Sequence, residues 1–291
     1  MKDFKGKTAV VTGGASGIGL GLARTFAREG MRVALLDNRA DALSGAAAAV
    51  REFAADGDVL AVACDVTDRE AVRRAADEIE ASFSKIHVLC NNAGVLVYGK
   101  HILETSFNEW DWIIANNLVG EINVVEILVP RILRHGEPGH VVNTSSIGGF
   151  QVRAELLTGA YSVVKYGVLA MTEALAGDLA GTNVGVSVLA PAAANTNIYR
   201  SVFHRPAKYG GPYTGRDDTP DELKGGMHGD LIGRRVLAAI RDGDLYIFTH
   251  YATKAWLERR HQRIIDAYDA TERWAKAEGL LEKAWVAGGA K

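Results

Sequence analysis

The stretch KTAVVTGGASGIG, residues 7–19, decides how this chain folds. Its apolar first half is typical of a strand, and the segment 17–30 has the composition of a helix that ends at Gly30. Glycines between these two segments permit a tight turn and let the backbone approach a pyrophosphate closely. They are Gly13, Gly17 and Gly19. The sequence therefore predicts a strand, a glycine-rich turn, and a helix whose first N–H groups bind phosphate.

Strand-like and helix-like runs alternate over the first 190 residues. The strand-like runs are almost continuously apolar, which is typical of a parallel sheet covered by helices on both faces. Strands are expected at 7–13, 32–37, 59–66, 87–94, 140–146 and 185–191, and helices at 17–30, 39–55, 68–84, 107–135 and 159–181. This order predicts an α/β, doubly wound Rossmann fold with a mostly parallel seven-stranded sheet.

The pattern changes after the last of these strands. Residues 192–228 contain prolines, glycines and polar groups without clear periodicity, and we expect them to form a long loop over a substrate site. A helix at 229–242 and a short strand at 244–248 follow, before a C-terminal helical extension at 252–291 that begins with a helix over 252–279. No linker or repeat is apparent, so the chain is predicted to be a single domain, 1–291.

The composition excludes several classes of protein. Apolar residues make up 48% and charged residues 23%, as in globular proteins, and the net charge of −2 gives no basic excess for nucleic acid or an anionic membrane. The N-terminus lacks a signal-peptide pattern, and no apolar run approaches the roughly 20 residues that cross a bilayer. The cysteines Cys64 and Cys90 lie in strand-like runs and are expected to be buried, reduced thiols. A cytoplasmic protein is predicted.

An acidic residue stands about 20 positions after the glycine turn, where dinucleotide-binding chains carry one. This residue is Asp37, at the end of the second predicted strand. Its carboxylate can accept both ribose hydroxyls of NAD and would repel the 2′-phosphate of NADP. Asn38 stands where a phosphate-binding arginine could occur, but Arg39 is nearby, so NADP is the less favoured cofactor and is not excluded.

The stretch GAYSVVKYGV, residues 159–168, places Tyr161 and Lys165 four positions apart on one helix face. A phenol with a pKa near 10 is a poor base at neutral pH, and an adjacent ammonium favours its ionised form. A tyrosine pKa lowered toward the working pH suits a general base. The alternative is that the two residues are ordinary neighbours on an amphipathic helix.

The chain resembles the short-chain dehydrogenase/reductase (SDR) family over about residues 7–200. The resemblance is carried by segments that occur in family order: TGGASGIG, CDV, NNAG, NNLVG, NTSS, YSVVK and APAAANT. It implies an NAD(P)-dependent alcohol dehydrogenase or ketoreductase. The implied catalytic residues are Asn117, Ser146, Tyr161 and Lys165, with Ser145 and Asn116 as the less favoured neighbours. Catalysis would then consist of hydride transfer to or from the nicotinamide, with Tyr161 as general acid or base.

The resemblance also implies the cofactor contacts. The aspartate of CDV would bind the adenine amine, the NNAG backbone would line the adenosine ribose, and the threonine of APAAANT would bind the nicotinamide carboxamide. The full set is Gly13, Ser16, Gly17, Ile18, Gly19, Asp37, Asp65, Val66, Asn92, Ala93, Gly94, Tyr161, Lys165, Pro191 and Thr196. Ser146 would orient the substrate oxygen, Lys165 would also bind the nicotinamide ribose, and Asn117 would hold a proton-relaying water. Each of these polar residues has a structural alternative, most plainly Asn117, which could bond main chain at a helix kink.

Two features depart from the family pattern. Ala192 replaces the glycine that usually follows Pro191. The spacing from Ser146 to Tyr161 is 15 residues, two more than in many family members, which places an insertion within 148–158. Both departures lie on the substrate side. The eight histidines are scattered without ligand spacing, and no metal is expected.

The substrate is expected to be a hydrophobic small molecule, because the segments that would line its site are apolar and aromatic. The expected lining residues are Leu96, Tyr98, Phe150, Leu157, Ile198, Tyr199 and Phe203. A narrower resemblance, in NTSSIGGF, RPAKYG and LYIFTH, is to bacterial Cα-dehydrogenases of lignin-type aryl ethers, and it implies an aromatic secondary alcohol or ketone. Steroid-like, terpenoid or acyl substrates are alternatives, and each lining residue could instead simply pack the loop.

Other functions and the assembly stay open at this point. A non-catalytic NAD-sensing or regulatory protein could keep the glycine turn, but it would need none of the four implied catalytic groups. An epimerase or dehydratase would usually carry a separate substrate domain. The helices at 107–135 and 159–181 have apolar faces beyond what a sheet would cover, and the family resemblance implies a homodimer or homotetramer formed through them.

Overall fold

The computed structural model describes residues 1–215 and 225–280. Its centre is a seven-stranded sheet in which every pairing is parallel and the strand order is β3-β2-β1-β4-β5-β6-β7. The strands are β1 (Thr8–Thr12), β2 (Arg32–Asp37), β3 (Val59–Ala63), β4 (Val88–Asn91), β5 (Gly139–Thr144), β6 (Val184–Ala190) and β7 (Tyr246–Phe248). The order reverses between β1 and β4, which is the switch point where open α/β sheets bind their ligands.

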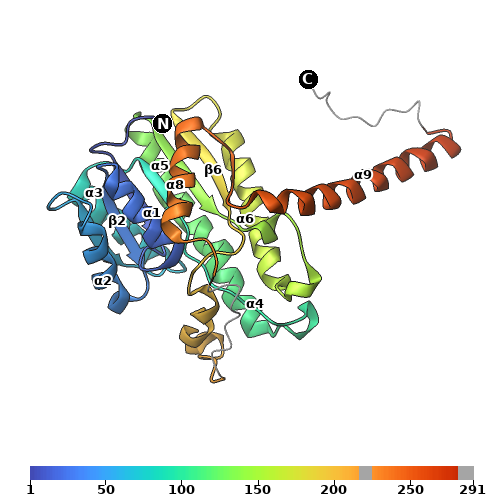
Figure 1. Cartoon of the computed structure of the whole chain (residues 1–291), viewed down its shortest axis with the longest axis horizontal. Helices are drawn as coiled ribbons and strands as arrows, with labels where there is room; N and C mark the ends of the chain where they lie inside the picture. The colour runs from blue at the N-terminus through green and yellow to red at the C-terminus, as the bar shows by residue number, and fades with distance from the viewer. Residues whose placement is uncertain (216–224, 281–291) are drawn as a thin grey trace. The chain divides into compact units, whose positions relative to one another are not determined.

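Helices connect the strands (Figure 1). They are α1 (Gly17–Arg28), α2 (Ala40–Arg51), α3 (Arg69–Phe83), α4 (Phe107–Ile114), α5 (Gly120–Arg134), α6 (Gly159–Asp178), α8 (Gly229–Asp242) and α9 (Lys254–Ala277). Short 3₁₀ turns are η1 (Ile102–Glu104), η3 (Ile147–Gly149), η4 (Ala154–Leu156), η5 (Ile198–His204), η6 (Ala207–Tyr209) and η7 (Tyr251–Thr253). The doubly wound fold predicted from the sequence is confirmed, and the sheet is entirely parallel.

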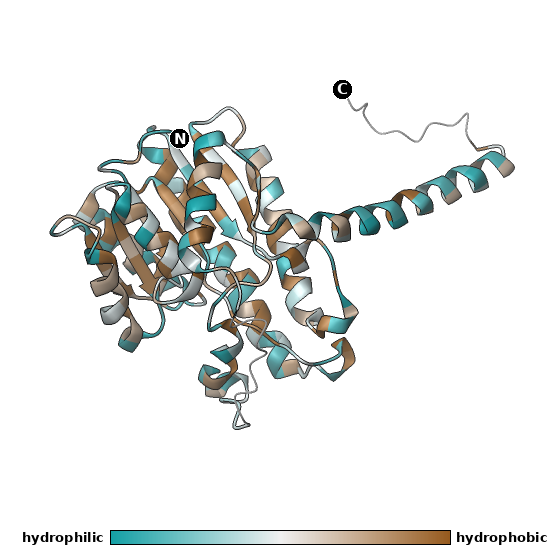
Figure 2. Cartoon of the chain, in the orientation of Figure 1, coloured by the Kyte–Doolittle hydropathy of each residue, from teal (hydrophilic) through white to brown (hydrophobic). Residues whose placement is uncertain are grey.

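Each face of the sheet has its own apolar core. Helices α1, α2 and α8 pack on one face, where Phe26 and Val11 are fully buried. Helices α3 and α5 and part of α6 pack on the other face, together with Val10 and Leu128. Neighbouring residues of β1 therefore point into opposite cores, as the pleat requires, and both cores exclude water. This double burial explains the continuously apolar strands, which Figure 2 shows as brown arrows inside the helical layers.

Most predicted elements occur within a few residues of their expected bounds. The single helix expected at 107–135 is helical throughout, but a π-helical turn, η2 (Ala115–Val119), separates α4 from α5. The loop expected at 192–228 contains η5 and η6, and its residues 216–224 lie outside the described part of the chain. Asp68 caps the start of α3, where its side chain accepts hydrogen bonds from the N–H groups of Glu70 and Ala71.

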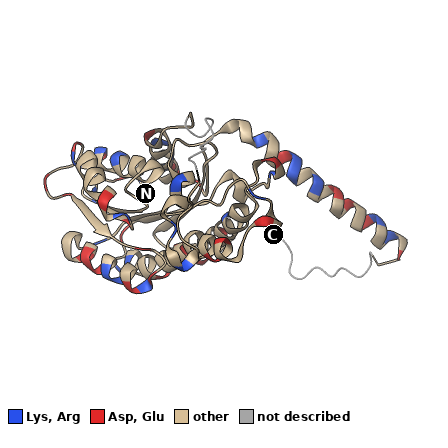
Figure 3. Cartoon of the chain, turned by 90° about the horizontal axis from the view of Figure 1, so that it is seen from below, with Lys and Arg blue, Asp and Glu red and all other residues tan. Residues whose placement is uncertain are grey.

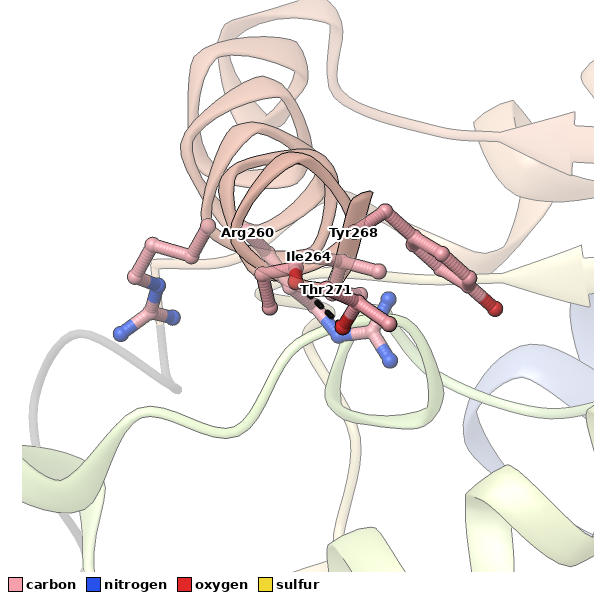
Figure 4. Close-up of a pocket in the computed structure, with 6 residues that line it drawn as sticks. Arg260, Ile264, Tyr268 and Thr271 are labelled. Atoms are coloured by element: carbon pink, nitrogen blue, oxygen red, sulfur yellow. Dashed lines mark hydrogen bonds between the residues drawn. The ribbon is translucent and has the colours of Figure 1, made fainter. Parts of the chain in front are cut away.

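The chain divides into two compact units, Met1–His250 and Tyr251–Lys291. The described part of the second unit consists of η7 and helix α9, which carries both cationic and anionic side chains along its length (Figure 3). A shallow hollow on one face of α9 is lined by Arg260, Arg263, Ile264, Ala267, Tyr268 and Thr271 (Figure 4). All of these residues come from one helix, and none belongs to the predicted active site.

One helical segment of the described chain, Phe107–Arg134, is long and apolar enough to cross a membrane by length and composition alone. Most of it is buried inside the protein, where its α5 part packs against the sheet. The core helix of a globular domain has the same composition, so burial in this fold explains its apolar character.

Candidate active site

The glycine turn that joins β1 to α1 has the geometry that a bound pyrophosphate needs. Gly13 and Gly17 have φ angles of +63° and +54°, which side chains disfavour. A Cβ atom on Gly19 would lie 2.1 Å from the carbonyl oxygen of Gly13, so only glycine allows the helix to start this close to the turn. The turn thus keeps open the space where the N–H groups of α1 point, and it fits a dinucleotide.

Asp37 ends β2 beside this turn and is only 8% exposed. Its Oδ2 accepts a hydrogen bond from the N–H of Ala15 at 3.1 Å, and its Oδ1 accepts one from the N–H of Arg39 at 3.0 Å. The Arg39 guanidinium lies 3.8 Å from Oδ1 and donates to the Ser16 hydroxyl at 3.3 Å. Two backbone N–H groups therefore fix the carboxylate at the mouth of the turn, where the sequence placed the ribose contact.

The loop after β4 is hydrogen-bonded to Thr12 at the end of β1. Thr12 Oγ1 accepts hydrogen bonds from the N–H groups of Asn92 and Ala93 at 2.8 and 3.0 Å, and the amide of Asn92 donates to the Thr12 carbonyl oxygen at 3.0 Å. The predicted segment Asn92–Ala93–Gly94 therefore lies against the glycine turn. Thr12 was not recognised in the sequence, because a strand-end threonine carries no signal apart from the glycines after it.

The other predicted cofactor contacts follow the ends of two further strands, β3 and β6. The segment after β3 lies beside Asp37, because the Cys64 N–H donates to the Asp37 carbonyl oxygen at 3.0 Å, and Asp65 and Val66 follow directly. On the other side of the switch point, a Cβ atom added to Gly17 would lie 3.0 Å from Thr196 Cγ2. Pro191 is buried at the end of β6. Residues far apart in sequence thus gather at one edge of the sheet.

Tyr161 and Lys165 lie on the first turns of α6, close to the end of β5. The Lys165 ammonium is 5.9 Å from the centre of the Tyr161 ring, and the phenol hydrogen-bonds with the Ser146 side chain. The neighbouring serine hydroxyl, Ser145, is buried and donates to the Lys165 carbonyl oxygen at 2.7 Å. Ser146 therefore lies beside the phenol, whereas Ser145 is bonded to the backbone of α6.

The pKa of Tyr161 does not follow the expectation from the sequence. Burial raises the pKa of the phenol above its ordinary value, Lys165 lowers it, and the carboxylate of Glu121 raises it again. The Ser146 hydrogen bond also lowers it, and the net direction is upward. The predicted effect of Lys165 is present, but burial and a second charge outweigh it in the protein alone.

Asn117 lies inside the π-helical turn between α4 and α5 and is fully buried. Its Oδ1 accepts from the Val95 N–H at 2.8 Å, and its Nδ2 donates to the Val95 carbonyl oxygen at 2.7 Å. The side chain thus bridges the helical turn to the loop after β4. This is the main-chain role that the sequence left open as an alternative, and the water-relay role of Asn117 stays a prediction.

Glu121 was not recognised in the sequence. It is 1% exposed at the start of α5, and its Oε1 accepts a hydrogen bond from Lys165 Nζ at 2.8 Å. Lys165 Nζ also donates to the Thr144 carbonyl oxygen at 2.6 Å. The available signal was a lone acidic residue in the mostly apolar run LVGEINVV.

The residues predicted to line the substrate site come from three segments that meet in space: 95–99, 148–157 and 197–213. The Gly99 N–H donates to the Leu157 carbonyl oxygen at 3.1 Å, and the Leu96 N–H donates to Ser201 Oγ at 3.1 Å. Tyr161 packs against an apolar cluster that includes Trp112 of α4 and Val202 of η5. The general acid or base predicted from the sequence therefore borders the same apolar region as the loop.

The individual lining residues differ in their surroundings. Phe150 is buried, and its ring packs edge-on against Phe248 of β7 with centroids 5.1 Å apart, which fits the alternative of core packing. Tyr98 is 45% exposed. Leu96 is buried, and the remaining four are partly buried: Leu157, Ile198, Tyr199 and Phe203.

The two cysteines are free and buried, as predicted. Burial raises the pKa of Cys64 to about 11 and raises that of Cys90 further, so neither thiol is a ready nucleophile. Within residues 1–215 and 225–280, no group of three His, Cys, Asp or Glu side chains is arranged to hold a metal ion.

Comparison with known proteins agrees with this geometry. The pattern of the short chain dehydrogenase family matches residues 7–207. The chain is 38% identical over 275 residues to a C alpha-dehydrogenase of Sphingobium sp., which covers 92% of this chain and 88% of that protein. It is 36% identical over 258 residues to a 1-deoxy-11-beta-hydroxypentalenate dehydrogenase of Streptomyces avermitilis, with 86% and 94% coverage.

A solved structure is also similar to this chain. It is a short chain dehydrogenase/reductase from Burkholderia phymatum in complex with NAD, with a TM-score of 0.83, 32% identity, and coverage of 91% of this chain and 96% of that chain. The narrower resemblance to Cα-dehydrogenases is confirmed by the Sphingobium relative. This chain belongs to the short-chain dehydrogenase/reductase family and is an oxidoreductase of the alcohol dehydrogenase and ketoreductase type.

Proposed function

We propose that this enzyme uses NAD to interconvert a hydrophobic, aromatic secondary alcohol and its ketone, with Tyr161 as general acid or base. The observation that carries the proposal is the arrangement of one phenol between Ser146 and the ammonium of Lys165, at the edge of an apolar cluster. A hydroxyl that hydrogen-bonds the phenol and a cation near its ring are the two groups that proton transfer at a carbonyl oxygen requires.

Each residue has a distinct role in this proposal. Tyr161 removes the proton from the alcohol during oxidation and returns it during reduction, and Ser146 orients the substrate oxygen toward it. Lys165 favours the ionised phenol through its positive charge. Asn117 holds the loop after β4 in place through Val95. A bound nicotinamide supplies the carbon that accepts or donates hydride, while the protein supplies position and electrostatic field.

NAD is the proposed cofactor because Asp37 occupies the position that would otherwise meet a 2′-phosphate. Its carboxylate is buried and anchored by two N–H groups, so it cannot swing away from that position without breaking both bonds. The related structure that contains NAD supports the same choice. NADP would require Arg39 to reach past Asp37.

The aromatic substrate is proposed from two observations. The cluster around Tyr161 contains Trp112, Val97 and Val202, so the surroundings of the phenol are apolar. The relative named a C alpha-dehydrogenase is similar over most of both chains. The second candidate substrate is a terpenoid alcohol, because another relative is named a 1-deoxy-11-beta-hydroxypentalenate dehydrogenase. Both candidates are bulky, mostly apolar alcohols.

Replacing Tyr161 with phenylalanine tests the catalytic role. We expect turnover to fall by about 10²- to 10⁴-fold, because general acid–base catalysis contributes that much. NADH binding, followed by fluorescence, should be nearly unchanged. Tyr166→Phe removes a hydroxyl from the same helix and serves as the matched control. A Tyr161→Phe enzyme with full turnover would reject the assignment, and NADH binding without any turnover in the wild-type chain would favour a sensing protein.

The substrate is identified by a panel of secondary alcohols offered with NAD, while the absorbance of the reduced cofactor is followed. Aryl alcohols with the hydroxyl on the carbon next to the ring should react faster than cyclic terpenoid alcohols. The reverse order would move the proposal to the terpenoid class.

We further propose a homodimer or homotetramer in the cytoplasm. Helices α4, α5 and α6 leave Ile114, Ile122 and Val163 exposed by 37%, 37% and 50%. Exposed apolar groups on neighbouring helices are typical of an interface. Buried, reduced cysteines fit a reducing compartment. Light scattering in solution tests the assembly, and cell fractionation tests the location.

A further inference from the structure

A carboxylate with no part in the proposed chemistry lies directly behind the catalytic lysine. Glu121 on α5 and Lys165 on α6 form an ion pair with 2.8 Å between Oε1 and Nζ, and their side chains are only 1% and 3% exposed. The second carboxylate oxygen, Oε2, is buried without a hydrogen-bond partner among the described residues. The pair joins residues 44 positions apart, so it depends on the tertiary fold.

Such a pair is hard to explain by stability alone. A buried carboxylate loses its hydration, and attraction to a single cation seldom compensates when one of its oxygens stays unbonded. The neighbours of Glu121 along α5, Val124 and Val125, are buried apolar residues that belong to the core, and an apolar residue at 121 would match them. The charge of Glu121 is therefore better explained by an electrostatic function than by stability.

We propose that Glu121 is a positioning residue that holds the ammonium of Lys165 and, by its own charge, controls how readily the Tyr161 phenol ionises. This inference deepens the function proposed above and rests on Tyr161 as the base. The ionised carboxylate fixes Lys165 Nζ between its Oε1 and the Thr144 carbonyl oxygen, so that two of the three N–H groups of the ammonium are used.

The charges around Glu121 are few. From α6 it faces Lys165 and, beyond it, Tyr161. The sheet presents neutral groups: the Asn91 amide of β4 donates to the Glu121 carbonyl oxygen at 2.9 Å, and β5 contributes Asn143, bonded to Asn91. On the far side of α5, Arg69 of α3 is bonded to the Asn123 amide oxygen.

This arrangement makes the carboxylate responsive near neutral pH. Burial raises the pKa of Glu121 to about 7, while Lys165 opposes the rise. When Glu121 is protonated, the ammonium acts on the phenol alone and favours its ionisation. When Glu121 is ionised, its negative charge cancels much of that effect. The two acids therefore titrate as a coupled system, in which ionisation of the carboxylate delays ionisation of the phenol.

The test uses Glu121→Gln, which removes the charge but keeps the size of the side chain and an oxygen for Lys165. Glu126→Gln is the matched control, because it removes an equal charge from an exposed position of the same helix. Tyrosinate absorbance is titrated in each free protein, and the same titration of its Tyr161→Phe derivative is subtracted. The difference isolates Tyr161 from the eight other tyrosines.

We expect the Tyr161 midpoint to fall by about one pH unit in Glu121→Gln, which is a tenfold larger acid dissociation constant. The Glu126→Gln midpoint should match that of the wild type. The acid limb of kcat/KM for alcohol oxidation should move to lower pH in parallel. An unchanged or higher midpoint in Glu121→Gln, or an equal shift in Glu126→Gln, would overturn the proposal.

Two controls separate the possible failures. If Glu121→Gln does not fold, the double variant Glu121→Gln/Lys165→Met should recover folding, because it leaves neither charge buried alone; a double variant that also fails to fold would overturn the pairing. If Tyr161→Phe keeps full turnover, the proposed function fails. The absorbance titration needs no turnover, so it judges Glu121 independently of that result.

Discussion

Asp37→Asn tests the cofactor preference with little disturbance of the fold. The asparagine is isosteric, and its amide oxygen can still accept one hydrogen bond from Ala15 or Arg39, whose N–H groups hold the carboxylate at 3.1 and 3.0 Å. What the substitution removes is the negative charge at the mouth of the glycine turn. It also releases Arg39, whose guanidinium lies 3.8 Å from the carboxylate.

The size of the effect follows from two contributions. Hydrogen bonds to a charged group contribute about 1 to 1.5 kcal/mol more than neutral ones, so two ribose hydroxyls would lose about 2 to 3 kcal/mol of NADH binding. That corresponds to roughly 30- to 150-fold weaker binding. Two unit charges 4 Å apart repel by about 4 kcal/mol at a partly exposed site, and removing even half of this repulsion would tighten NADPH binding by about 30-fold.

The assay is a fluorescence titration of the wild type, Asp37→Asn and Asp41→Asn with NADH and NADPH. Asp41 lies exposed in the first turn of α2. Asp41→Asn therefore removes an equal negative charge four residues away from Asp37 and serves as the control. We expect the NADH preference to be reduced by at least two orders of magnitude in Asp37→Asn and to persist in Asp41→Asn. Equal binding of the two cofactors by the wild type would refute the role of Asp37. An unchanged preference in Asp37→Asn would show that another group decides it.

Two further predictions concern the turn and the assembly. Gly19→Ala should abolish measurable NADH binding and lower the melting temperature, because its Cβ would lie 2.1 Å from the Gly13 carbonyl oxygen. The control is Gly45→Ala in α2, where no atom lies within 4 Å of the added Cβ and the protein should be stabilised by about 1 kcal/mol. Normal NADH binding by Gly19→Ala would contradict the geometry of the turn. Light scattering should give a molar mass of two or four times 31.2 kDa, and Val163→Glu should lower it, whereas a monomeric wild type would remove the proposed interface.

The fold was predictable because its signals are local. Each strand is apolar along its whole length since both faces of the sheet are covered, and the pattern needs only five or six residues to be visible. Strand ends could be recognised for the same reason, and Asp37 was expected at the end of the second strand, where it lies. Thr196 was implied only by the family resemblance. In a parallel sheet every strand ends at the same edge, where ligands bind, so residues that follow predicted strands are candidates for the binding site.

Packing decided what the sequence could not. Phe150 was expected to line the substrate site because it lies in one of the apolar and aromatic segments predicted to surround the substrate. In the structure its ring lies against Phe248 and Tyr246 of β7, with centroids 5.1 and 6.0 Å away. The π-helical turn at Ala115–Val119 was also hidden, because one extra residue in a helix leaves the apolar pattern almost unchanged.

The direction of the Tyr161 pKa shows the same limit more sharply. The spacing of Tyr161 and Lys165 reveals a phenol beside a cation, but it says nothing about burial or about a third charge from another helix. A lysine placed on the inward face of an apolar helix must lose its water, and it then needs a buried acceptor with a negative charge. Glu121, the one acidic residue in the first turn of α5, is that acceptor. A lone acid in one buried helix and a lone base in another should therefore be examined as a pair before either is assigned a separate role.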